Sequence, residues 1–505
     1  MDLELLLQGV DAVRRAGPSH AVTGLEYDSR RTGPGSLFVA MQGGTTDGNR
    51  FISQATAQGA NVIVTDSAAA FDSTRTESPG IAVVQVREGI PHGRRALATL
   101  SANFFGHPEE QLKLSAVTGT NGKTTTAFLL EAMLSHQGRT TILVGTIEYH
   151  VAGKVKPSPH TTPESRDLFE LFREGLDAGA SEAVMEVSSH ALDQGRVFGL
   201  TFDVAIFTNL TRDHLDYHGS MENYFAAKRK LFDGSEGRPA RASVLNSDDE
   251  YGRELNGIAA RAGSDAIYTY GMRSGDFRAS GVEMSPSGMR FDMSTPWGTA
   301  KIETRLTGRV NVYNLLAASA AAIARGLTLD QIAAGVASLT HIPGRFESVV
   351  CGQNFAVIVD YAHTDDALKN VLGASRDFVK QTNGRVITLF GCGGDRDRTK
   401  RPLMGRAAGL ASDVVVLTSD NPRSEEPQAI LKDVLPGLEG ARARVIVEPD
   451  REKAIQMAIH EARQGDLVLL AGKGHEKTQT LRDRVIPFDD AAVARGFLEA
   501  LVKEE

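Results

Sequence analysis

Residues 113–126, Lys-Leu-Ser-Ala-Val-Thr-Gly-Thr-Asn-Gly-Lys-Thr-Thr-Thr, decide the fold. The first six form an apolar, β-rich run, a glycine-rich turn occupies 119–122, and a helical pattern starts at Lys123. A strand, a tight turn and a helix N-terminus in this order direct backbone N–H groups and the helix dipole at phosphate oxygens. The segment therefore predicts a phosphate-binding loop at the edge of a parallel sheet.

This loop departs from the full P-loop pattern, because Val117 stands where that pattern has its first glycine. The core Gly-x-x-Gly-Lys-Thr-Thr is retained and favours nucleotide binding over a purely structural turn. In this interpretation Lys123 neutralises the β- and γ-phosphates, and the hydroxyl of Thr124 binds Mg²⁺.

Apolar runs alternate with helical patterns on both sides of the loop. Continuous apolar strands separated by helices indicate parallel sheets that are covered on both faces. We expect a less regular stretch with antiparallel edge strands at 233–307, and a domain joint at 341–345, where Pro-Gly breaks both periods. The expected strands are 61–65, 81–86, 113–118, 141–145, 183–187, 204–208, 355–360, 385–390, 413–418, 443–447 and 466–471. The expected helices are 97–105, one from Lys123, 311–325, 328–338 and 490–502.

Length and composition indicate a multidomain α/β protein. The 505 residues include 41% hydrophobic and 23% charged residues, with a net charge of −8. These values fit about three domains and argue against a disordered chain or a general nucleic-acid binder. Two cysteines, Cys351 and Cys392, exclude a disulfide scaffold and suit a reducing cytosol. Without a signal-peptide pattern or a run near ~18 apolar residues, we expect a cytoplasmic protein with no membrane insertion.

Three further residues are candidates for chemistry. Glu186 ends an apolar strand, at the edge where α/β sheets usually bind ligands, and His214 follows the next strand. A lone histidine is more often structural, but the phosphate loop and Glu186 in the same sheet favour a functional role. Lys228 lies in a short basic run, and by itself this pattern indicates a solvated helix face.

Sequence motifs are spread along essentially the whole chain. They are Asp28-Ser29-Arg30, residues 34–40, Asp47-Gly48, residues 119–126, 186–190, 208–210 and 213–216, Ala227-Lys228, and residues 360–364, 391–397 and 472–476. These motifs resemble, in the same order, those of the Mur ligases, the ATP-dependent amino-acid ligases of peptidoglycan synthesis. The resemblance implies an N-terminal α/β nucleotide-sugar domain at 1–108, a central P-loop ATPase-like domain with a mostly parallel sheet at 109–341, and a C-terminal Rossmann-like doubly wound domain at 342–505.

The motif Asp420-Asn421-Pro422-Arg423 resembles that of the family members that add meso-diaminopimelate to UDP-N-acetylmuramoyl-L-alanyl-D-glutamate (UDP-MurNAc-L-Ala-D-Glu). Arg423 offers a planar fork for a carboxylate, and Asp420 with Asn421 can hold an ammonium group. Meso-diaminopimelate carries both groups at its distal centre, whereas L-lysine lacks that carboxylate. The motif therefore favours diaminopimelate. A lysine-adding member, folylpolyglutamate synthase and a nucleotide-dependent binding or switch protein are the alternatives.

The resemblance also implies roles for individual residues. Lys228 matches the family's carbamylated lysine, which replaces our local interpretation of a solvated face, and a CO2-derived carbamate there would bind or orient Mg²⁺. The implied catalytic and metal-binding residues are Lys123, Thr124, Glu186, His214 and Lys228. ATP would meet Gly119, Thr120, Asn121, Gly122, Lys123, Thr124, Thr125, Asn311, Arg345 and Asp360. UDP-MurNAc-L-Ala-D-Glu would meet Tyr27, Ser29, Gly44, Thr45, Thr46, Thr161, Thr162, Ser188, Gln194 and Arg196. Diaminopimelate would meet Arg396, Asp420, Asn421, Pro422, Arg423, Gly472 and Glu476.

We expect these small molecules to be the partners of a monomeric enzyme that binds no nucleic acid. One departure from the family pattern is local: Asp365 stands where the family usually has proline. Aspartate is a favourable residue at a helix start, so we expect a helix to begin there.

Overall fold

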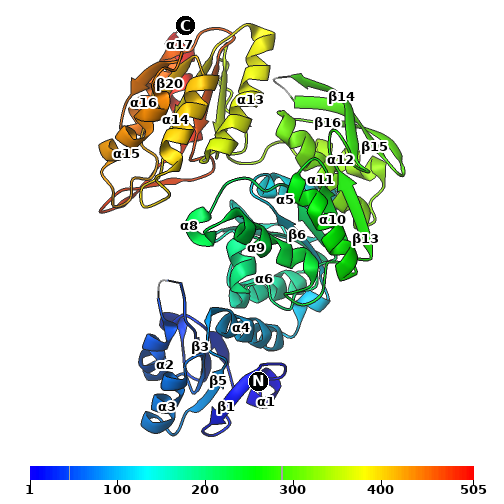
Figure 1. Ribbon diagram of the computed structural model, residues 1–505, viewed down its shortest axis with the longest axis vertical. Helices are drawn as coiled ribbons and strands as arrows, with labels where there is room; N and C mark the ends of the chain where they lie inside the picture. The colour runs from blue at the N-terminus through cyan, green and yellow to red at the C-terminus, as the bar shows by residue number, and fades with distance from the viewer. Residues whose placement is uncertain (45, 286–287, 505) are drawn as a thin grey trace.

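The computed structural model describes residues 1–44, 46–285 and 288–504. Three α/β units follow one another along the long axis, from the N-terminal unit at the bottom of Figure 1 to the C-terminal unit at the top. Within the described ranges, no helix has both the length and the apolar character needed to cross a bilayer.

The N-terminal unit is a parallel sheet with one antiparallel edge strand, and both of its faces are covered. The order is β1 (Ala12–Ala16), β5 (Ala82–Val86), β4 (Val62–Thr65), β3 (Ser36–Ala40) and β2 (Gly24–Glu26), with β1 antiparallel to β5. Phe38 faces α2 (Ile52–Ala57) and α3 (Ala68–Glu77), whereas Leu37 faces α1 (Leu3–Leu6) and α4 (Ile90–Phe105). Helix α4 starts before the expected residue 97, and Ala102 near its end packs into the core of the central unit.

The central unit has a mostly parallel sheet that is buried on both faces, as the sequence predicted. Val117 and Ile206 pack beside α5 (Lys123–His136) and α11 (Arg309–Ala324). Ala116 and Ala205 face α6 (Ser165–Asp177) and α9 (Met221–Asp233). The strand order is β13 (Ala266–Tyr270), β12 (Ala242–Asn246), β11 (Val204–Phe207), β6 (Lys113–Thr118), β10 (Glu182–Glu186), β7 (Thr141–Val144), β8 (Glu148–Val151) and β9 (Lys154–Pro157), with β8 and β9 antiparallel.

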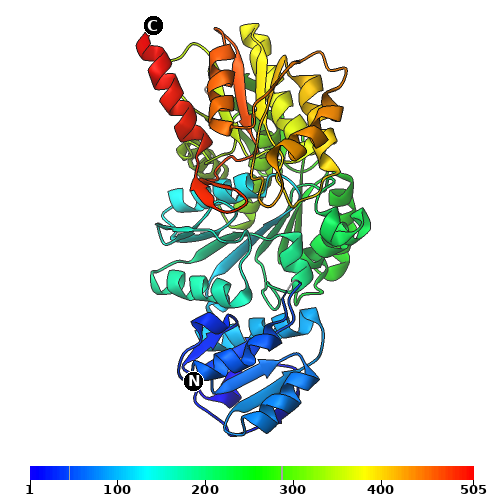
Figure 2. The same cartoon turned by 90° about the vertical axis from the view of Figure 1, so that its left-hand side faces the viewer.

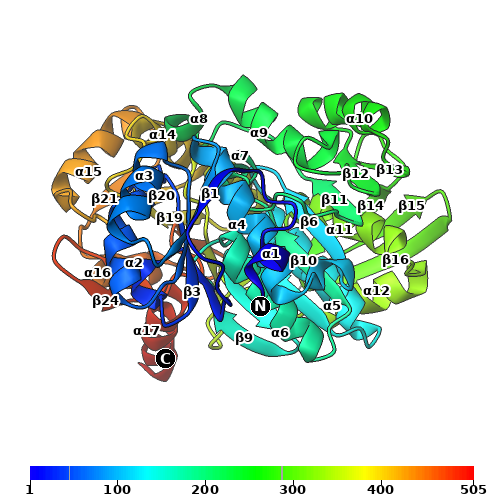
Figure 3. The same cartoon turned by 90° about the horizontal axis from the view of Figure 1, so that it is seen from below.

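Residues 233–307 are more regular than the sequence indicated. They contain β12, α10 (Glu250–Ala262) and β13, and the two strands extend the parallel sheet. The antiparallel strands β14 (Arg278–Ser285), β15 (Gly288–Thr295) and β16 (Gly298–Thr304) do form, but as a separate sheet rather than as edge strands of the main one. This sheet lies at one side of the molecule beside α12 (Leu329–Ser338) (Figures 1 and 3).

The C-terminal unit is doubly wound, which confirms the expected fold class. Helices α13 (Asp365–Thr382), α14 (Lys400–Ala411) and α15 (Pro427–Val434) cover one face of its sheet, and α16 (Arg451–Glu461) and α17 (Asp490–Glu504) cover the other. Figure 2 shows α17 in red along the outer edge. The strand order is β17 (Glu347–Ser348), β18 (Ala356–Asp360), β22 (Leu467–Ala471), β19 (Val386–Phe390), β20 (Val414–Leu417) and β21 (Arg444–Val447).

The joint between the central and C-terminal units is closely packed. Gly344 has a φ of +63°, and a β-carbon there would lie 2.0 Å from the backbone nitrogen of His475. Its carbonyl accepts a hydrogen bond of 3.0 Å from the backbone N–H of Tyr361. The chain therefore changes domain directly beside the loop 472–476. Helix α13 starts at Asp365 with Thr364 as its N-cap, as the sequence predicted.

Candidate active site between the central and C-terminal domains

Three adjoining cavities lie between the central and C-terminal domains. A cavity of about 360 Å³ contains Asn311, a second of about 210 Å³ contains Lys123, and a third of about 470 Å³ contains Arg423. Arg345 lines both the first and the second cavity, and His214 lines both the second and the third. The second cavity therefore connects a site at the central domain with a site at the C-terminal domain.

The phosphate loop closes tightly on neighbouring backbone and side chains. Gly119 has a φ of +146°, and a β-carbon there would lie 1.8 Å from Oγ1 of Thr208. The Nζ of Lys123 donates to the carbonyls of Gly119 and Thr120, at 3.0 and 2.9 Å. Burial lowers the pKa of Lys123, against the raising effect of Glu186 and Asp213. A negatively charged phosphate in this cavity would offset that cost of burial.

Lys228 is buried against the phosphate loop rather than solvated, so the local sequence interpretation was wrong. It is 1% exposed, its Nζ donates to the carbonyl of Gly119 at 2.8 Å, and it lies 4.7 Å from the ring centre of Tyr224. Burial, together with the nearby charge of Lys123, lowers the pKa of Lys228 well below its usual range. A buried amine with a depressed pKa has a larger neutral fraction, which is the form that reacts with electrophiles.

Glu186 ends β10 in a fixed orientation. Its two carboxylate oxygens accept from the backbone N–H and the hydroxyl of Thr146, at 2.8 and 3.0 Å, and the residue is 1% exposed. In the described ranges, one group of three His, Cys, Asp or Glu side chains lies close enough together to hold a metal ion. It is His107, Glu109 and Glu110, and it lies outside these cavities. Glu186 therefore belongs to no ready-made metal cage of such ligands.

His214 adopts a left-handed backbone conformation with a φ of +53° at the start of α8 (Leu215–His218). Its backbone N–H donates to Asp213 at 2.8 Å, and its ring lies edge-on to His190 at 4.9 Å. Burial lowers the pKa of His214 to about 4, although Asp213 raises it. The imidazole is therefore neutral near pH 7 and can offer a lone pair to a cation.

The cavity of about 360 Å³ brings together the residues that the resemblance implies for ATP from both domains. Asn311 and Asp360 both line it. Arg345 donates to the hydroxyl of Thr124 at 3.1 Å, which links the joint to the phosphate loop. Asp360 is fixed by the backbone N–H groups of Phe346 and Ala362, at 2.8 and 2.9 Å. Burial raises the pKa of Asp360, and Arg345 opposes this shift.

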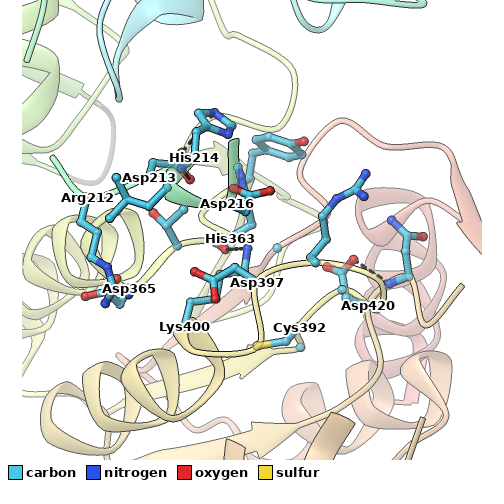
Figure 4. A pocket seen from close by; sticks show the side chains of 18 of the residues that line it. Arg212, Asp213, His214, Asp216, His363, Asp365, Cys392, Asp397, Lys400 and Asp420 are labelled. Atoms are coloured by element: carbon cyan, nitrogen blue, oxygen red, sulfur yellow. Dashed lines mark hydrogen bonds and ion pairs between the residues drawn. The ribbon is translucent and has the colours of Figure 1, made fainter. Parts of the chain in front are cut away.

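The cavity of about 470 Å³ receives side chains from both domains, as Figure 4 shows for His214, Asp213 and Asp420. Pro422 does not line it; this residue is buried, and its carbonyl oxygen would lie 1.9 Å from a β-carbon added at Gly394. Arg423 uses one guanidinium N–H to bind the carbonyl of Gly394 at 2.8 Å, and its other donors have no partner among the described residues. The lining includes Arg396, Asp420, Asn421, Arg423, Gly472 and Glu476.

The residues assigned to the nucleotide-sugar fall into separate places. Near the phosphate loop, the hydroxyl of Thr162 donates to the carbonyl of Glu186 at 2.9 Å, and Arg196 donates to the carbonyl of Thr162 at 2.8 Å. Farther away, the hydroxyl of Tyr27 donates to Asp167 of the central domain at 2.6 Å. Thr161 and Ser188 line the cavity of about 210 Å³, and the side chain of Gln194 accepts a hydrogen bond from Arg196. In the N-terminal unit, the hydroxyl of Ser29 donates to Gln54, and Gly44 and Thr46 are exposed. Thr45 lies outside the described residues.

Sequence reasoning missed several residues that the structure places at the cleft. Asp366, from the C-terminal domain, accepts from Asn121 at 2.8 Å and from Thr211 at 3.0 Å, so it binds the phosphate loop across the interface. Asp213 and His363 each line two of the cavities. The quoted motifs contain Asp213 and His363 but do not distinguish a role for them. For Asp366, the available signal in the sequence was its position two residues after the motif at 360–364.

Family models match most of this chain. The model described as "Mur ligase middle domain" matches residues 117–322, and "Mur ligase, glutamate ligase domain" matches 344–474. A third, "Mur ligase family, catalytic domain", matches 21–105. The matched segments fall on the central, C-terminal and N-terminal sheets respectively.

Relatives match along nearly the full chain. A Solibacter usitatus protein named UDP-N-acetylmuramoyl-L-alanyl-D-glutamate--2,6-diaminopimelate ligase is 51% identical over 503 residues, which cover 99% of this chain and 98% of that protein. A protein of the same name from Geobacillus thermodenitrificans is 47% identical and covered in full, as is this chain. A solved structure with that name is 32% identical, has a TM-score of 0.66 and covers 95% of each chain.

The close contact at Gly119 predicts that this position tolerates no side chain. In Gly119→Ala, the β-carbon would lie 1.8 Å from Oγ1 of Thr208, so the loop must move away from its phosphate-binding geometry. We expect ATP affinity, measured by calorimetry, to fall roughly tenfold or more, a loss of about 1.4 kcal/mol.

The matched control is Gly138→Ala, just after α5. Gly138 also has a positive φ, +75°, but nothing lies within 4 Å of the added carbon. Alanine strains the backbone at both positions because both φ values are positive, but only the substitution at Gly119 also creates a steric clash. Equal ATP affinities for the two variants would contradict the steric argument.

Proposed function

The chain belongs to the Mur ligase family, and we propose that it adds meso-diaminopimelate to the D-glutamyl γ-carboxylate of UDP-MurNAc-L-Ala-D-Glu, using ATP and releasing ADP and phosphate. The observation that carries this proposal is the line of three adjoining cavities, with the loop of Lys123 in the middle one and Arg423 in the last. The names of the relatives, at 51% and 47% identity over nearly the whole chain, support the same reaction.

A carboxylate is a poor acyl donor, so the first step is transfer of the γ-phosphoryl group of ATP to it. Lys123, whose amine lies between loop carbonyls, offers its charge to the transferring group. Asn311, Arg345 and Asp360 bind the nucleotide from the first cavity. The resulting acyl phosphate lies in the middle cavity, where the amine of diaminopimelate attacks it and phosphate leaves. No protein nucleophile is required, so the site acts by positioning and electrostatics.

The donor groups around the middle cavity fit Mg²⁺ once Lys228 is modified. Glu186 supplies a buried carboxylate and Thr124 a hydroxyl, which are the oxygen ligands that Mg²⁺ prefers. His214 is neutral and can complete the set. Bound Mg²⁺ would neutralise phosphate charge during transfer. Few protein ligands are gathered in advance, which suits an ion that keeps waters and binds substrate phosphates.

We infer that Lys228 carries a carbamate in the active protein. Its amine is buried, its pKa is lowered, and it lies against the carbonyl of Gly119. Carbamate formation joins the neutral amine to the carbon of CO2 and releases one proton, so the amine becomes an anion. An anion here would face Lys123 and could bind Mg²⁺, whereas an unmodified ammonium would repel both.

The amino-acid end of the cleft favours meso-diaminopimelate over L-lysine. Arg423 keeps guanidinium donors unpaired toward the cavity, and these can bind the distal carboxylate in two-pronged fashion. Asp420 and Glu476 line the same cavity and suit the distal ammonium. L-lysine has no distal carboxylate that Arg423 could bind.

A non-catalytic binding protein of this fold is the alternative from another class. It would not need a buried lysine, a fixed buried carboxylate and a diamino-acid pocket around one chain of cavities.

Both cysteines are free, which suits the cytoplasm as the site of this reaction. A monomeric state stays a prediction.

The reaction and the pocket are tested together by offering each amino acid with ATP and UDP-MurNAc-L-Ala-D-Glu. We expect strong preference for meso-diaminopimelate over L-lysine. In Arg423→Met, kcat/KM for diaminopimelate should fall about 10- to 100-fold, because a hydrogen bond to a charged group contributes about 1.5–3 kcal/mol.

The control for this substitution is Arg482→Met, at an exposed position outside the cavity. Arg482→Met should keep wild-type kinetics. Preference of the wild type for lysine would retain the ligase but overturn the pocket assignment, and no product with either amino acid would overturn the proposed function.

The carbamate is tested with Lys228→Ala, which we expect to lose at least about 100-fold in kcat, the scale of one electrostatic contact in a transition state. Short carboxylic acids such as acetate or propionate should restore part of the rate, because they can place a carboxylate in the space left by the side chain. The control is Lys230→Ala on the same helix, where the amine instead pairs with Asp193 at 3.2 Å. Wild-type rates in Lys228→Ala would exclude the role, and a loss that no acid restores would leave the carbamate unsupported.

A further inference from the structure

A fully buried lysine lies directly behind the amino-acid cavity. Lys473 is 0% exposed, and it is absent from the cavity lining, although Gly472 and Glu476 on either side are part of it. Its Nζ donates to Oε2 of Glu476 at 2.9 Å and to Oδ1 of Asn421 at 3.3 Å. A buried ammonium is costly unless it is paired and hydrogen-bonded, and here both partners belong to the pocket wall.

The contact with Lys473 fixes the amide of Asn421 in one orientation. Its Oδ1 accepts from Lys473 and also from the backbone N–H of Thr480 at 2.9 Å. Two donors on one side leave the amide nitrogen facing the other way, where it donates to Oε2 of Glu476 at 2.8 Å. Rotating the amide by half a turn would place donors against donors, so the three groups form a closed triangle.

The triangle leaves particular oxygens available to a ligand. Oε2 of Glu476 accepts from both Lys473 and Asn421, whereas Oε1 has no hydrogen-bond partner among the described residues. Asp420 shows the same asymmetry: Oδ1 accepts from the backbone N–H of Asn421 at 2.6 Å, and Oδ2 has no such partner in the described part of the chain. Both residues line the cavity, so one free oxygen of each can receive an ammonium group.

The charges behind the pocket assign this role to Lys473 rather than to its buried neighbour Arg451. Arg451 and Asp490 are both fully buried and form a two-pronged pair, with bonds of 2.8 and 2.6 Å. The charge of Arg451 is therefore compensated chiefly by Asp490. Lys473 instead forms its ion pair with Glu476, and Asp420 has no ion pair among the described residues, so its carboxylate can receive a cationic ligand.

We propose that Lys473 is a positioning residue that determines how the pocket recognises the distal centre of a diamino acid. It holds Glu476 and Asn421 so that Oε1 of Glu476 and Oδ2 of Asp420 bind the distal ammonium while Arg423 binds the adjacent carboxylate. Contacts of this kind read the configuration of the centre as well as its charges. The inference rests on the proposed function and adds a residue that touches no substrate.

The test measures KM for each substrate in Lys473→Met, which keeps an unbranched side chain but removes the charge. We expect KM for meso-diaminopimelate to rise roughly tenfold or more, since a charge-assisted bond orients the carboxylate that binds it. KM for ATP and for the nucleotide-sugar should change less than about twofold. Selectivity for the meso isomer over the L,L isomer should fall, a change that a general loss of stability would not produce.

Two further variants sharpen the result. Lys477→Met removes a lysine from the same loop whose amine pairs with Asp489 at 2.7 Å and whose side chain is 64% exposed, and it should match the wild type. If Lys473 acts through Glu476, the double variant Lys473→Met/Glu476→Gln should have no higher KM for meso-diaminopimelate than Glu476→Gln alone. If the two substitutions instead raise this KM additively, the proposal that Lys473 acts through Glu476 is overturned.

The remaining outcomes are also decisive. An unchanged KM for diaminopimelate in a folded Lys473→Met, or equal rises for all three substrates, would overturn the proposal. If that variant does not fold, Lys473→Gln, which keeps a donor but no charge, is judged by the same criteria. If the wild type turns over meso-diaminopimelate and the Lys473 variants keep its KM, only the role of Lys473 is rejected. If the wild type forms no diaminopimelate-dependent product, the proposed function is rejected and this inference with it.

Discussion

The site depends on one constraint: two parallel sheets present the carboxyl ends of their strands to the same cleft. In the central domain these ends carry Thr118, just before the phosphate loop, and Glu186. In the C-terminal domain they carry Asp360 and, one residue after Ala471, Gly472. Side chains at such ends lie close together because the strands are parallel, so ligands bind there. The two edges face each other across cavities that are lined by residues of both domains.

Burial of charge is the second feature that organises the cleft. Lys228 and Lys473 are fully buried and Lys123 is half-buried, and each has its amine bound to a carbonyl or carboxylate. Such groups are costly in an empty site and become favourable when anionic phosphates or carboxylates arrive. In the proposed reaction, electrostatic preorganisation of this kind would supply rate without a protein nucleophile.

The sequence was sufficient for the parallel sheets, the phosphate loop and the family, because apolar strand runs and a glycine turn are local signals. It was insufficient where structure depends on distant partners. The burial of Lys228 could not be predicted from its basic neighbours, because its environment is built by the loop of Gly119. The contact of Asp366 with Asn121 joins two domains and leaves no periodic trace. Residues 233–307 looked irregular because short strands there alternate with turns, although β12 and β13 extend the main sheet.

The most direct test of the account follows an oxygen atom. The γ-carboxylate of UDP-MurNAc-L-Ala-D-Glu is labelled with ¹⁸O, the protein is supplied with ATP and meso-diaminopimelate, and the released phosphate is analysed by mass spectrometry. The account predicts that one labelled oxygen appears in each phosphate, because the acyl phosphate carries the carboxylate oxygen away when the amine displaces it. Product formation with unlabelled phosphate would contradict phosphoryl activation in the cleft between the two sheets.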